Sequence, residues 1–385
     1  VTEAFPIVLF VKKLEDNSRR VMEITECEIL EDGTRYTGTL FGHKAPVTGE
    51  VVFTTGMTGY QETLTDPSYC GQIVCMTYPL IGNVGVNDID NESAGVKMRG
   101  FIVSELCDVP SNWQMKKTLD QYLDEQGVTG LYGVDTRALT KILRSQGSMN
   151  GMLTCAEHFN VAEIMEKLKN YKVTGTVERV TRKEPEVFSA YGEERHHVAM
   201  MDFGVKQNMI ECLRRRGCHV TVFPATTPAE TVLSGGFDGV MLSNGPGDPA
   251  DNVGIIAEVK KLYESNIPLF AVCLGHQLMA LATGAKTGRL AYGHRGGNHP
   301  VRDLEAKRVF ITSQNHGYMV LADSVDPAVA EVSHINVNDG TCEGLRYKRP
   351  NCFTTQFHPE ANAGPKDTEY LFNRFIESMD QGGAR

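Results

Sequence analysis

The chain has 385 residues, which is too long for one ordinary compact domain and predicts two domains or three. Hydrophobic residues make up 41% of the sequence and charged residues 22%, as expected of a soluble chain with sizeable cores. Lys and Arg number 38 against 48 Asp and Glu, so the net charge of −10 gives no basic footprint for nucleic acid or an anionic membrane.

Membrane insertion and secretion are not expected from the sequence. No apolar run reaches the roughly 18 residues that a transmembrane helix needs. The apolar stretch 4–11 follows an acidic residue and precedes two lysines, the reverse of a secretory signal. The 10 cysteines form no CxxC pair and no zinc-type quartet, so we expect reduced, mostly buried thiols in a cytoplasmic protein, with Cys273 as the exception.

The first half of the chain is rich in strand and turn signals. A short strand of branched side chains is predicted at 50–55. Helices are predicted at 118–126, 136–145 and 162–171. Between 174 and 195 the composition becomes polar and charged, which predicts a linker.

In the second half, strands alternate with helices, which is typical of a parallel, doubly wound sheet. The strands are predicted at 198–201, 219–223, 239–242 and 267–272. The helices are predicted at 206–216, from 228, at 253–265 and at 275–283. Beyond residue 300 we expect short strands and a final helix at 367–379. The sequence therefore predicts an α/β fold with two domains.

The segment 267–285 places a cysteine between a buried strand and a helix. This is the layout of a nucleophile elbow, in which a sharp turn at Cys273 lifts the side chain out of the sheet. Gly275 lacks the Cβ that would crowd the turn, and the helix N-terminus favours a thiolate. The amide of Leu274 would face a developing oxyanion. A small buried cysteine at a strand end is the alternative that this segment alone leaves open.

Two further motifs follow strands in the same half of the chain. In LSNGPGDP (242–249), Gly245 and Gly247 allow backbone amides to point at an anion or a carbonyl oxygen, although an ordinary βα turn fits equally well. In QFHPEA (356–361), Pro359 favours an extended backbone, in which His358 and Glu360 face the same side. The carboxylate would then orient the imidazole as in a catalytic triad, and a solvated surface pair is the alternative. The presence of all three motifs in one α/β domain favours a catalytic thiol.

CLGHQ, FHPEA and SNGPGDP together resemble class I glutamine amidotransferases, which hydrolyse the side-chain amide of glutamine and pass the ammonia to a partner active site. The strings at 50–87, 135–151, 202–208 and 293–301 resemble the small-chain family of carbamoyl-phosphate synthetase, and the likeness begins at about residue 28. It implies a C-terminal class I glutaminase domain with a mainly parallel sheet, preceded by a smaller β-rich α/β domain. The implied boundaries are an unassigned extension (1–25), the small-chain N-terminal domain (26–155), a helix and linker (156–195) and the glutamine amidotransferase domain (196–383).

The resemblance also implies roles for individual residues. Cys273 would be the nucleophile, His358 the base and then the acid, and Glu360 its orienting carboxylate. The implied glutamine pocket contains Ser68, Gly245, Gly247, Leu274, Gln277, Asn315, Gly317 and Tyr318. Because Ser68 comes from the first domain, the pocket is predicted at the domain interface.

Partners follow from the same resemblance. It implies glutamine as substrate, a γ-glutamyl thioester, and a large synthetase chain that holds ATP, Mg and bicarbonate. No cofactor or metal is expected on this chain, no nucleic acid or membrane partner is expected, and higher oligomers of heterodimers are allowed.

Three other functions compete with that of a glutaminase chain in carbamoyl-phosphate synthetase: a stand-alone thiol hydrolase of γ-glutamyl amides, a glutaminase subunit of a different synthase, and a scaffold without activity. The large first domain argues against the hydrolase, and the three triad residues argue against the scaffold. The pairs His196–His197 and His294/His299 could suggest a metal site. They lack a carboxylate or thiolate at useful spacing, so we interpret them as solvated or loop histidines.

Overall fold

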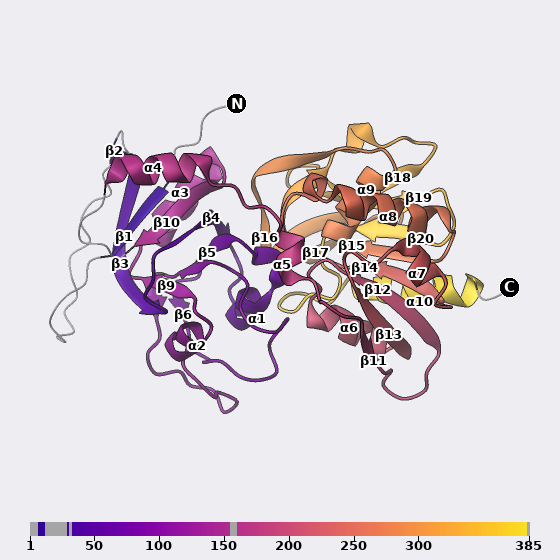
Figure 1. Cartoon of the computed structure of the whole chain (residues 1–385), viewed down its shortest axis with the longest axis horizontal. Coiled ribbons are helices and arrows are strands. Elements are labelled where there is room, and N and C mark those ends of the chain that lie inside the picture. The colour runs from indigo at the N-terminus through magenta and orange to yellow at the C-terminus, as the bar shows by residue number, and fades with distance from the viewer. Residues whose placement is uncertain (1–6, 12–28, 31–32, 155–159, 383–385) are drawn as a thin grey trace. The chain divides into compact units, whose positions relative to one another are not determined.

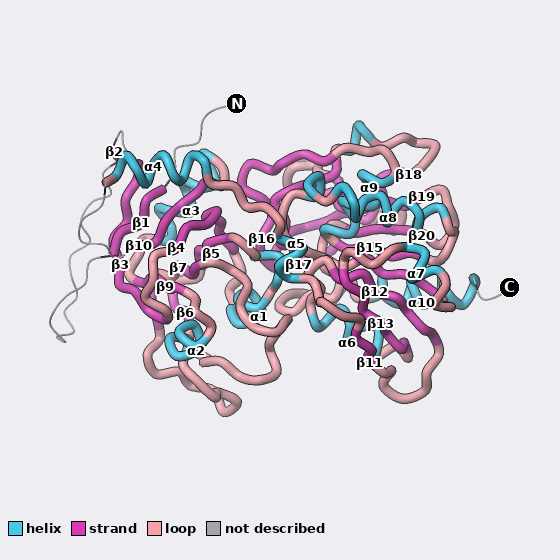
Figure 2. The backbone as a smooth tube through the Cα atoms, viewed as in Figure 1, coloured by secondary structure: helices cyan, strands magenta, loops and turns pink. Residues whose placement is uncertain are grey.

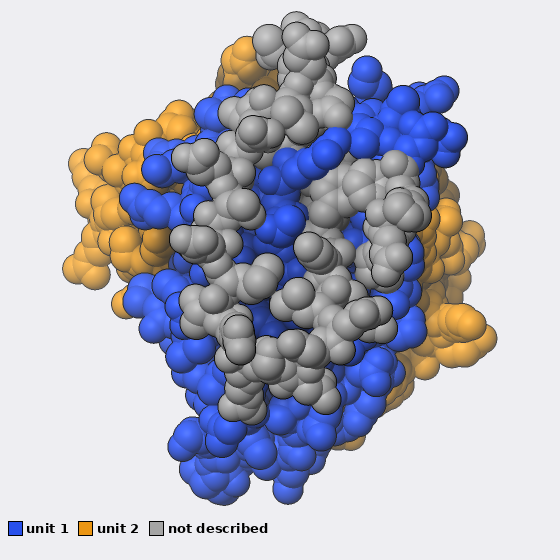
Figure 3. All heavy atoms as spheres, turned by 90° about the vertical axis from the view of Figure 1, so that its left-hand side faces the viewer, with its two compact units in different colours: residues 1–65, 71–173 blue, residues 66–70, 174–385 orange. Residues whose placement is uncertain are grey.

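The computed structural model describes residues 7–11, 29–30, 33–154 and 160–382, and the chain forms two compact units (Figures 1 and 3). The first unit contains Val1–Thr65 and Gly71–Val173, and the second contains Asp66–Cys70 and Thr174–Arg385. The short segment Asp66–Cys70 therefore belongs to the second unit, although the chain on both sides of it belongs to the first. Most of the predicted extension 1–25 lies outside the described residues.

The first unit is built on a sheet with the strand order β1, β10, β4, β5, β7, β9, β3, β2 (Figure 2). Because β1 also pairs with β3, the pairings close on themselves. The strands are β1 (Ile7–Val11), β2 (Ile29–Leu30), β3 (Gly33–Gly42), β4 (Val47–Thr54), β5 (Gln72–Met76), β7 (Gly100–Ile102), β9 (Thr129–Tyr132) and β10 (Met149–Thr154). A second, two-stranded sheet joins β6 (Leu80–Ile81) and β8 (Glu105–Leu106). The prediction of a β-rich first domain is confirmed.

Three helices of the first unit begin and end within one residue of their predicted bounds, whereas the helix at Tyr60–Thr65 was not predicted. The helices of this unit are α1 (Tyr60–Thr65), α2 (Leu119–Glu125), α3 (Thr136–Gln146) and α4 (Val161–Asn170). The Thr118 side chain caps α2 in a reciprocal capping box with Gln121. Asp135 caps α3, and Gly147 ends that helix with a φ of 95°, which favours glycine.

The second unit contains one mixed sheet with the strand order β11, β13, β12, β14, β15, β20, β19, β17, β16, β18. The strands from β13 to β20 in this order are parallel, and the remaining pairings are antiparallel. The parallel strands are β12 (His196–Asp202), β13 (Cys218–Pro224), β14 (Gly239–Leu242), β15 (Leu269–Val272) and β20 (Cys352–Thr355). The antiparallel strands are β11 (Glu186–Phe188), β16 (Thr287–Asp303), β17 (Arg308–Val320), β18 (Ala330–Asn336) and β19 (Cys342–Tyr347).

Alternate side chains of the parallel strands face two separate hydrophobic cores. Met201 and Leu242 pack with helices α7, α8 and α9, whereas Met200 and Phe270 pack with α6 and α10. The helices of this unit are α5 (Thr176–Val180), α6 (Gln207–Arg214), α7 (Ala229–Leu233), α8 (Val253–Glu264), α9 (Leu274–Ala282) and α10 (Tyr370–Gly382). Because helices cover both faces of the parallel strands, the predicted doubly wound α/β fold is confirmed.

Two stretches differ from the sequence prediction. The polar segment 174–195, predicted as a linker, forms α5 and the edge strand β11. An edge strand buries little of its surface, and here Phe188 is the side chain that packs against the core. Beyond residue 300, β18, β19 and β20 are short as expected, but β17 is long and pairs with the equally unexpected long strand β16, with two register shifts in their pairing. No helix in the described part of the chain is long and apolar enough to span a membrane.

Candidate active site

Cys273 lies in a sharp turn between the end of β15 and the start of α9. Its φ of 54° and ψ of −105° lie in a region that residues other than glycine rarely adopt. A Cβ on Gly275 would lie 2.5 Å from the Leu242 carbonyl oxygen, so the turn requires glycine there. The predicted elbow geometry is therefore confirmed, and the cysteine lies beside the N-terminal turn of a helix.

His358 and Glu360 meet through a turn rather than along an extended strand. The Ala361 amide donates to the His358 carbonyl oxygen at 3.1 Å, which closes the turn, and the His358 amide donates to the Ser313 carbonyl oxygen at 2.9 Å. His358 Nδ1 lies 2.6 Å from Glu360 Oε1, and both side chains are buried. The expected pairing of the two side chains is present, but it forms across a turn instead of along a strand.

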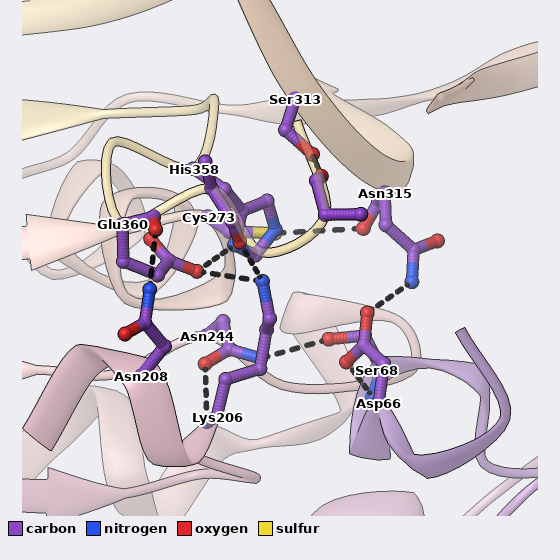
Figure 4. A network of polar contacts seen from close by, with 12 residues as sticks. Asp66, Ser68, Lys206, Asn208, Asn244, Cys273, Ser313, Asn315, His358 and Glu360 are labelled. Atoms are coloured by element: carbon purple, nitrogen blue, oxygen red, sulfur yellow. Dashed lines mark hydrogen bonds and ion pairs between the residues drawn. The ribbon is translucent and has the colours of Figure 1, made fainter. Parts of the chain in front are cut away.

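Figure 4 shows the Cys273 sulfur beside the imidazole of His358. The Cys273 thiol donates to the Asn315 carbonyl oxygen at 3.7 Å. Burial by itself lowers the pKa of His358, but the Glu360 carboxylate and the Cys273 sulfur outweigh it and raise this pKa to about 10. The imidazole is thus held in its protonated form between a sulfur and a carboxylate.

Two residues that the sequence analysis gave no role hold Glu360 in place. Lys206, itself buried, places its Nζ 3.1 Å from Glu360 Oε1 and 2.6 Å from the Ala361 carbonyl oxygen. Asn208 donates to the Glu360 carbonyl oxygen at 2.6 Å (Figure 4). Burial raises the pKa of Glu360, but Lys206 and His358 outweigh that effect and lower it to about 2. Glu360 is therefore a charged carboxylate between two cations.

The segment around Ser68 joins this network through side-chain amides. Asn244 donates to Ser68 Oγ at 3.0 Å, and its own oxygen accepts the Lys206 amide at 3.2 Å. Asn315 donates to Asp66 Oδ2 at 2.8 Å, and Asp66 Oδ1 accepts the Ser68 amide at 2.9 Å. Ser68 and Asn315, two of the residues expected in the glutamine pocket, are thus linked to the surroundings of Cys273 and Glu360 (Figure 4).

Gln277 and Tyr318, also expected in the pocket, contact each other directly. Gln277 lies in α9 and Tyr318 in β17, and Gln277 Nε2 donates to the Tyr318 carbonyl oxygen at 2.8 Å. Gly317 precedes Tyr318 in the same strand. The C-terminal part of β17 therefore runs beside the first turns of the helix that follows Cys273.

The glycines after β14 permit two close backbone approaches. A Cβ on Gly245 would lie 2.2 Å from the Phe203 carbonyl oxygen and 2.8 Å from the Leu274 side chain. Gly247 has a φ of 90°, and a Cβ there would lie 2.3 Å from Thr176 Oγ1. Both positions therefore require glycine, and Gly245 lies close to Leu274, the first residue of α9.

The described cysteines are free thiols, and all of them except Cys107 are buried. Burial raises the pKa of several to about 12, namely Cys75, Cys212, Cys218, Cys342 and Cys352. The expectation of mostly buried cysteines is confirmed for these residues. Cys27 and Cys155 lie outside the described residues.

The interpretation of the paired histidines as solvated or loop residues is wrong, because His196 and His197 lie in β12, His294 and His299 lie in β16, and none of the four is exposed. His294 lies in β16 and is buried, with its Nε2 2.8 Å from Asp339 Oδ2 and its Nδ1 3.4 Å from Glu343 Oε1. Both carboxylates come from a distant part of the chain, which local spacing could not reveal. His196 lies in β12 and contacts Asp380 at 3.0 Å.

Sequence reasoning missed Lys206 for a similar reason. The string DFGVKQN at 202–208 carried part of the family likeness, but the partner of Lys206 lies 154 residues further along the chain. A lysine between a buried strand and a helix is the one local signal, because lysine is rarely buried without a partner.

Comparison with known proteins matches each half of the chain to a protein family. The family model for the carbamoyl-phosphate synthase small chain, CPSase domain, matches residues 29–153, and the model for glutamine amidotransferase class-I matches residues 199–378. A carbamoyl phosphate synthase small chain of Bacillus cereus is 50% identical over 352 residues, which cover 91% of this chain and 95% of the relative. One from Fusobacterium nucleatum is 50% identical over 91% of this chain and 97% of the relative.

A solved structure of a glutamine amidotransferase from Thermotoga maritima matches 49% of this chain and 84% of that chain. Its TM-score is 0.36 at 18% identity, which is too weak to support an argument. The two family matches and the 50% identity along nearly the whole length are decisive. The chain belongs to the carbamoyl phosphate synthase small chain family, as an enzyme subunit with a class I glutamine amidotransferase domain.

Proposed function

We propose that the chain is the glutamine-hydrolysing subunit of carbamoyl phosphate synthase and that Cys273, His358 and Glu360 release ammonia for a large, ATP-using partner chain. The observation that carries the proposal is the convergence of a strained cysteine at a helix start with a buried His–Glu pair. Family membership supports the substrate, because the relatives are named as small chains of this synthase.

In the first half of the proposed reaction, the Cys273 thiolate attacks the amide carbon of glutamine. The raised pKa of His358 favours an imidazolium beside the sulfur, so the ring holds the proton that the leaving ammonia needs. The amide of Leu274, in the first turn of α9, has no acceptor within its helix, and with that of Gly247 it would stabilise the oxyanion.

In the second half, water hydrolyses the γ-glutamyl thioester with His358 as the base. Glu360 keeps the imidazole oriented and charged, and Lys206 keeps Glu360 ionised in its buried position. Splitting amide hydrolysis through a thioester replaces one difficult step by two easier ones. Glutamate then leaves from a pocket that we assign to Ser68, Gln277, Asn315 and their neighbours.

A partner chain is proposed because the ammonia must be used elsewhere. In the first unit several large apolar side chains are exposed, namely Met57, Ile89, Val109 and Trp113. Trp113, the single tryptophan of the sequence, is 91% exposed. Exposed aromatic and aliphatic side chains are typical of protein contacts, so we assign these side chains to contacts with the large chain. The free thiols suit a reducing compartment, and we therefore propose a cytoplasmic location.

The proposal is tested by mixing this chain with a large synthetase chain, ATP and bicarbonate. Carbamoyl phosphate should form from either glutamine or ammonia, and the partner's substrates should raise the otherwise low rate of glutamine hydrolysis. The Cys273→Ala complex should use ammonia only. A Cys273→Ala complex that also fails with ammonia, or a wild-type chain that hydrolyses glutamine at full rate alone and never co-elutes with the large chain, would contradict the proposal.

A further inference from the structure

A second buried group of titratable side chains lies in the antiparallel half of the second unit. His294 in β16 and His316 in β17 are directly opposite each other in the strand register, and Glu343 lies in β19. All three are buried, with exposed fractions of 6%, 6% and 0%. One ligand atom from each lies within 4.8 Å of the others, and none of these residues belongs to the proposed triad.

Hydrogen bonds on the outer side of the two imidazoles fix which nitrogen carries the proton. His294 Nε2 lies 2.8 Å from the Asp339 carboxylate, and His316 Nδ1 lies 2.7 Å from the Tyr318 carbonyl oxygen. Both partners are acceptors only, so each of these nitrogens must donate an N–H. In the neutral rings the lone pairs are then on His294 Nδ1 and His316 Nε2, the two nitrogens that face Gln314 Oε1.

Both lone pairs face an acceptor atom, the side-chain oxygen of Gln314. Gln314 Oε1 lies 3.1 Å from His294 Nδ1 and 2.9 Å from His316 Nε2. Its amide cannot be reversed, because Gln314 Nε2 donates to Thr312 Oγ1, whose own hydroxyl donates to the His299 carbonyl oxygen. Two imidazole lone pairs therefore converge on an amide oxygen.

The Glu343 carboxylate adds negative charge at the same place. Its Oε1 lies 3.4 Å from His294 Nδ1 and accepts one hydrogen bond, from Asn336 at 2.9 Å. Within the described ranges, no group donates to its buried Oε2. An added proton on one histidine would satisfy some of these contacts only, whereas a cation at their centre would satisfy all of them.

We propose that His294 Nδ1, His316 Nε2 and the Glu343 carboxylate bind a divalent transition-metal ion, with Gln314 Oε1 as a fourth oxygen. Two imidazoles and a carboxylate are a donor set that Zn²⁺ accepts. The outer hydrogen bonds of His294 to a carboxylate and of His316 to a backbone carbonyl are those that orient metal-binding histidines. The ion would join β16, β17 and β19 in a closed structural site.

The ion would also support the pocket, a consequence that rests on the proposed function, whereas metal binding itself does not. The Tyr318 carbonyl oxygen accepts from both His316 and Gln277. A metal that holds His316 would therefore hold the part of β17 that we assign to the glutamine pocket. Removal of the ion should raise KM for glutamine more than it lowers kcat.

The test uses the full chain carrying Cys273→Ala, so that the reactive thiol cannot bind the probe. The protein is stripped with a chelator and titrated with Co²⁺, whose visible ligand-field absorption reports coordination, and with Zn²⁺ in competition. We expect one ion per chain and loss of at least tenfold in affinity in Glu343→Gln. The matched control, Glu331→Gln, changes a partly exposed carboxylate in the adjacent strand β18, where it pairs with Arg346, and should bind like its parent.

Asp339→Asn provides a second variant should Glu343→Gln fail to fold, because Asp339 is partly exposed and acts through His294. It should weaken Co²⁺ binding by roughly 10- to 100-fold. Absence of saturable Co²⁺ absorption, or equal affinity in the parent, the Glu343→Gln and the Asp339→Asn proteins, would overturn the proposal. In that case the cluster is a hydrogen-bonded group that takes up a proton.

Discussion

The second unit buries two histidine–glutamate groups that differ in how their charges are compensated. Glu360 lies between His358 and Lys206, so one negative charge faces two positive ones. Glu343 faces His294, and the hydrogen bond that it receives comes from the neutral amide of Asn336. In the first group two cations compensate the carboxylate, and a cysteine lies beside the imidazole. This arrangement suits proton transfer. In the second group the lone pairs of two histidine nitrogens converge, and this arrangement suits a metal ion.

The difference shows why a buried His–Glu pair does not by itself indicate catalysis. A nucleophile must reach the imidazole, and Cys273 supplies it from a strained turn that Gly275 permits. No such side chain accompanies His294 in the described ranges.

Cys273→Ala should have the largest effect. Glutamine hydrolysis should fall by roughly 10⁴-fold or more, because the thioester can no longer form. The matched control is Cys107→Ser in the first unit, which should keep the wild-type rate, since Cys107 lies outside the second unit. Both rates are measured as ammonia release from glutamine. Near-normal hydrolysis by Cys273→Ala would refute the proposed mechanism.

His358 and Glu360 should act as one unit. His358→Asn should lose nearly as much activity as Cys273→Ala, and Glu360→Gln less, since a carboxylate that orients the base acts through it. The double variant should be little worse than His358→Asn alone. A double-mutant cycle on kcat measures this coupling, and losses that add in free energy would count against the pairing.

The buried charges should make stability depend on pH in two windows. The pKa of His358 is about 10 against an ordinary 6.5, so its contribution is complete below pH 6.5 and is lost as the pH rises through 10. The pKa of Glu360 is about 2 against 4.5, so its contribution is present above pH 4.5 and is lost as the pH falls toward 2.

Urea denaturation across both windows measures this prediction. The difference in unfolding free energy between wild type and His358→Asn should shrink between pH 6.5 and 10, by an amount on the order of a few kcal/mol. A difference that stays constant across that window would mean that His358 is neutral in the folded chain.

Gly275→Ala should have the smallest of these effects. The added methyl group would lie 2.5 Å from the Leu242 carbonyl oxygen, so the elbow must shift, at a cost of about 1–3 kcal/mol. Gly254→Ala in α8 is the matched control, because a Cβ there meets nothing within 4 Å. It should be neutral or slightly stabilising. Equal unfolding free energies for the two variants would show that the turn tolerates a side chain.

The sequence predicts those parts of the fold in which neighbours along the chain decide the structure. The alternation of apolar strands and helices predicts β12, β14 and α8 close to their observed bounds, and Cys273 with Gly275 predicts the elbow. The polar composition of 174–195 misleads, because an edge strand such as β11 needs few apolar residues.

Side chains that meet only in the folded chain could not be predicted in the same way. Lys206 and Glu360 are separated by 154 residues, and their pairing depends on how β12 and the turn after β20 are arranged. Likewise, His294 reaches Asp339 and Glu343 because β16, β17 and β19 lie in one sheet. The spacing of residues along the chain carries no information on such contacts. The only sequence signal for them is a lysine or histidine placed in or next to a strand that is predicted to be buried.

Cys273 is proposed to form a covalent bond with the γ-carbonyl carbon of glutamine. Rapid acid quenching of the full chain during turnover, followed by mass spectrometry of its peptides, tests this directly. We predict a mass increase of one γ-glutamyl group on the peptide that contains Cys273, and its absence in Cys273→Ala. Steady turnover of glutamine without any adduct on that peptide, or with the adduct on another cysteine, would contradict the account.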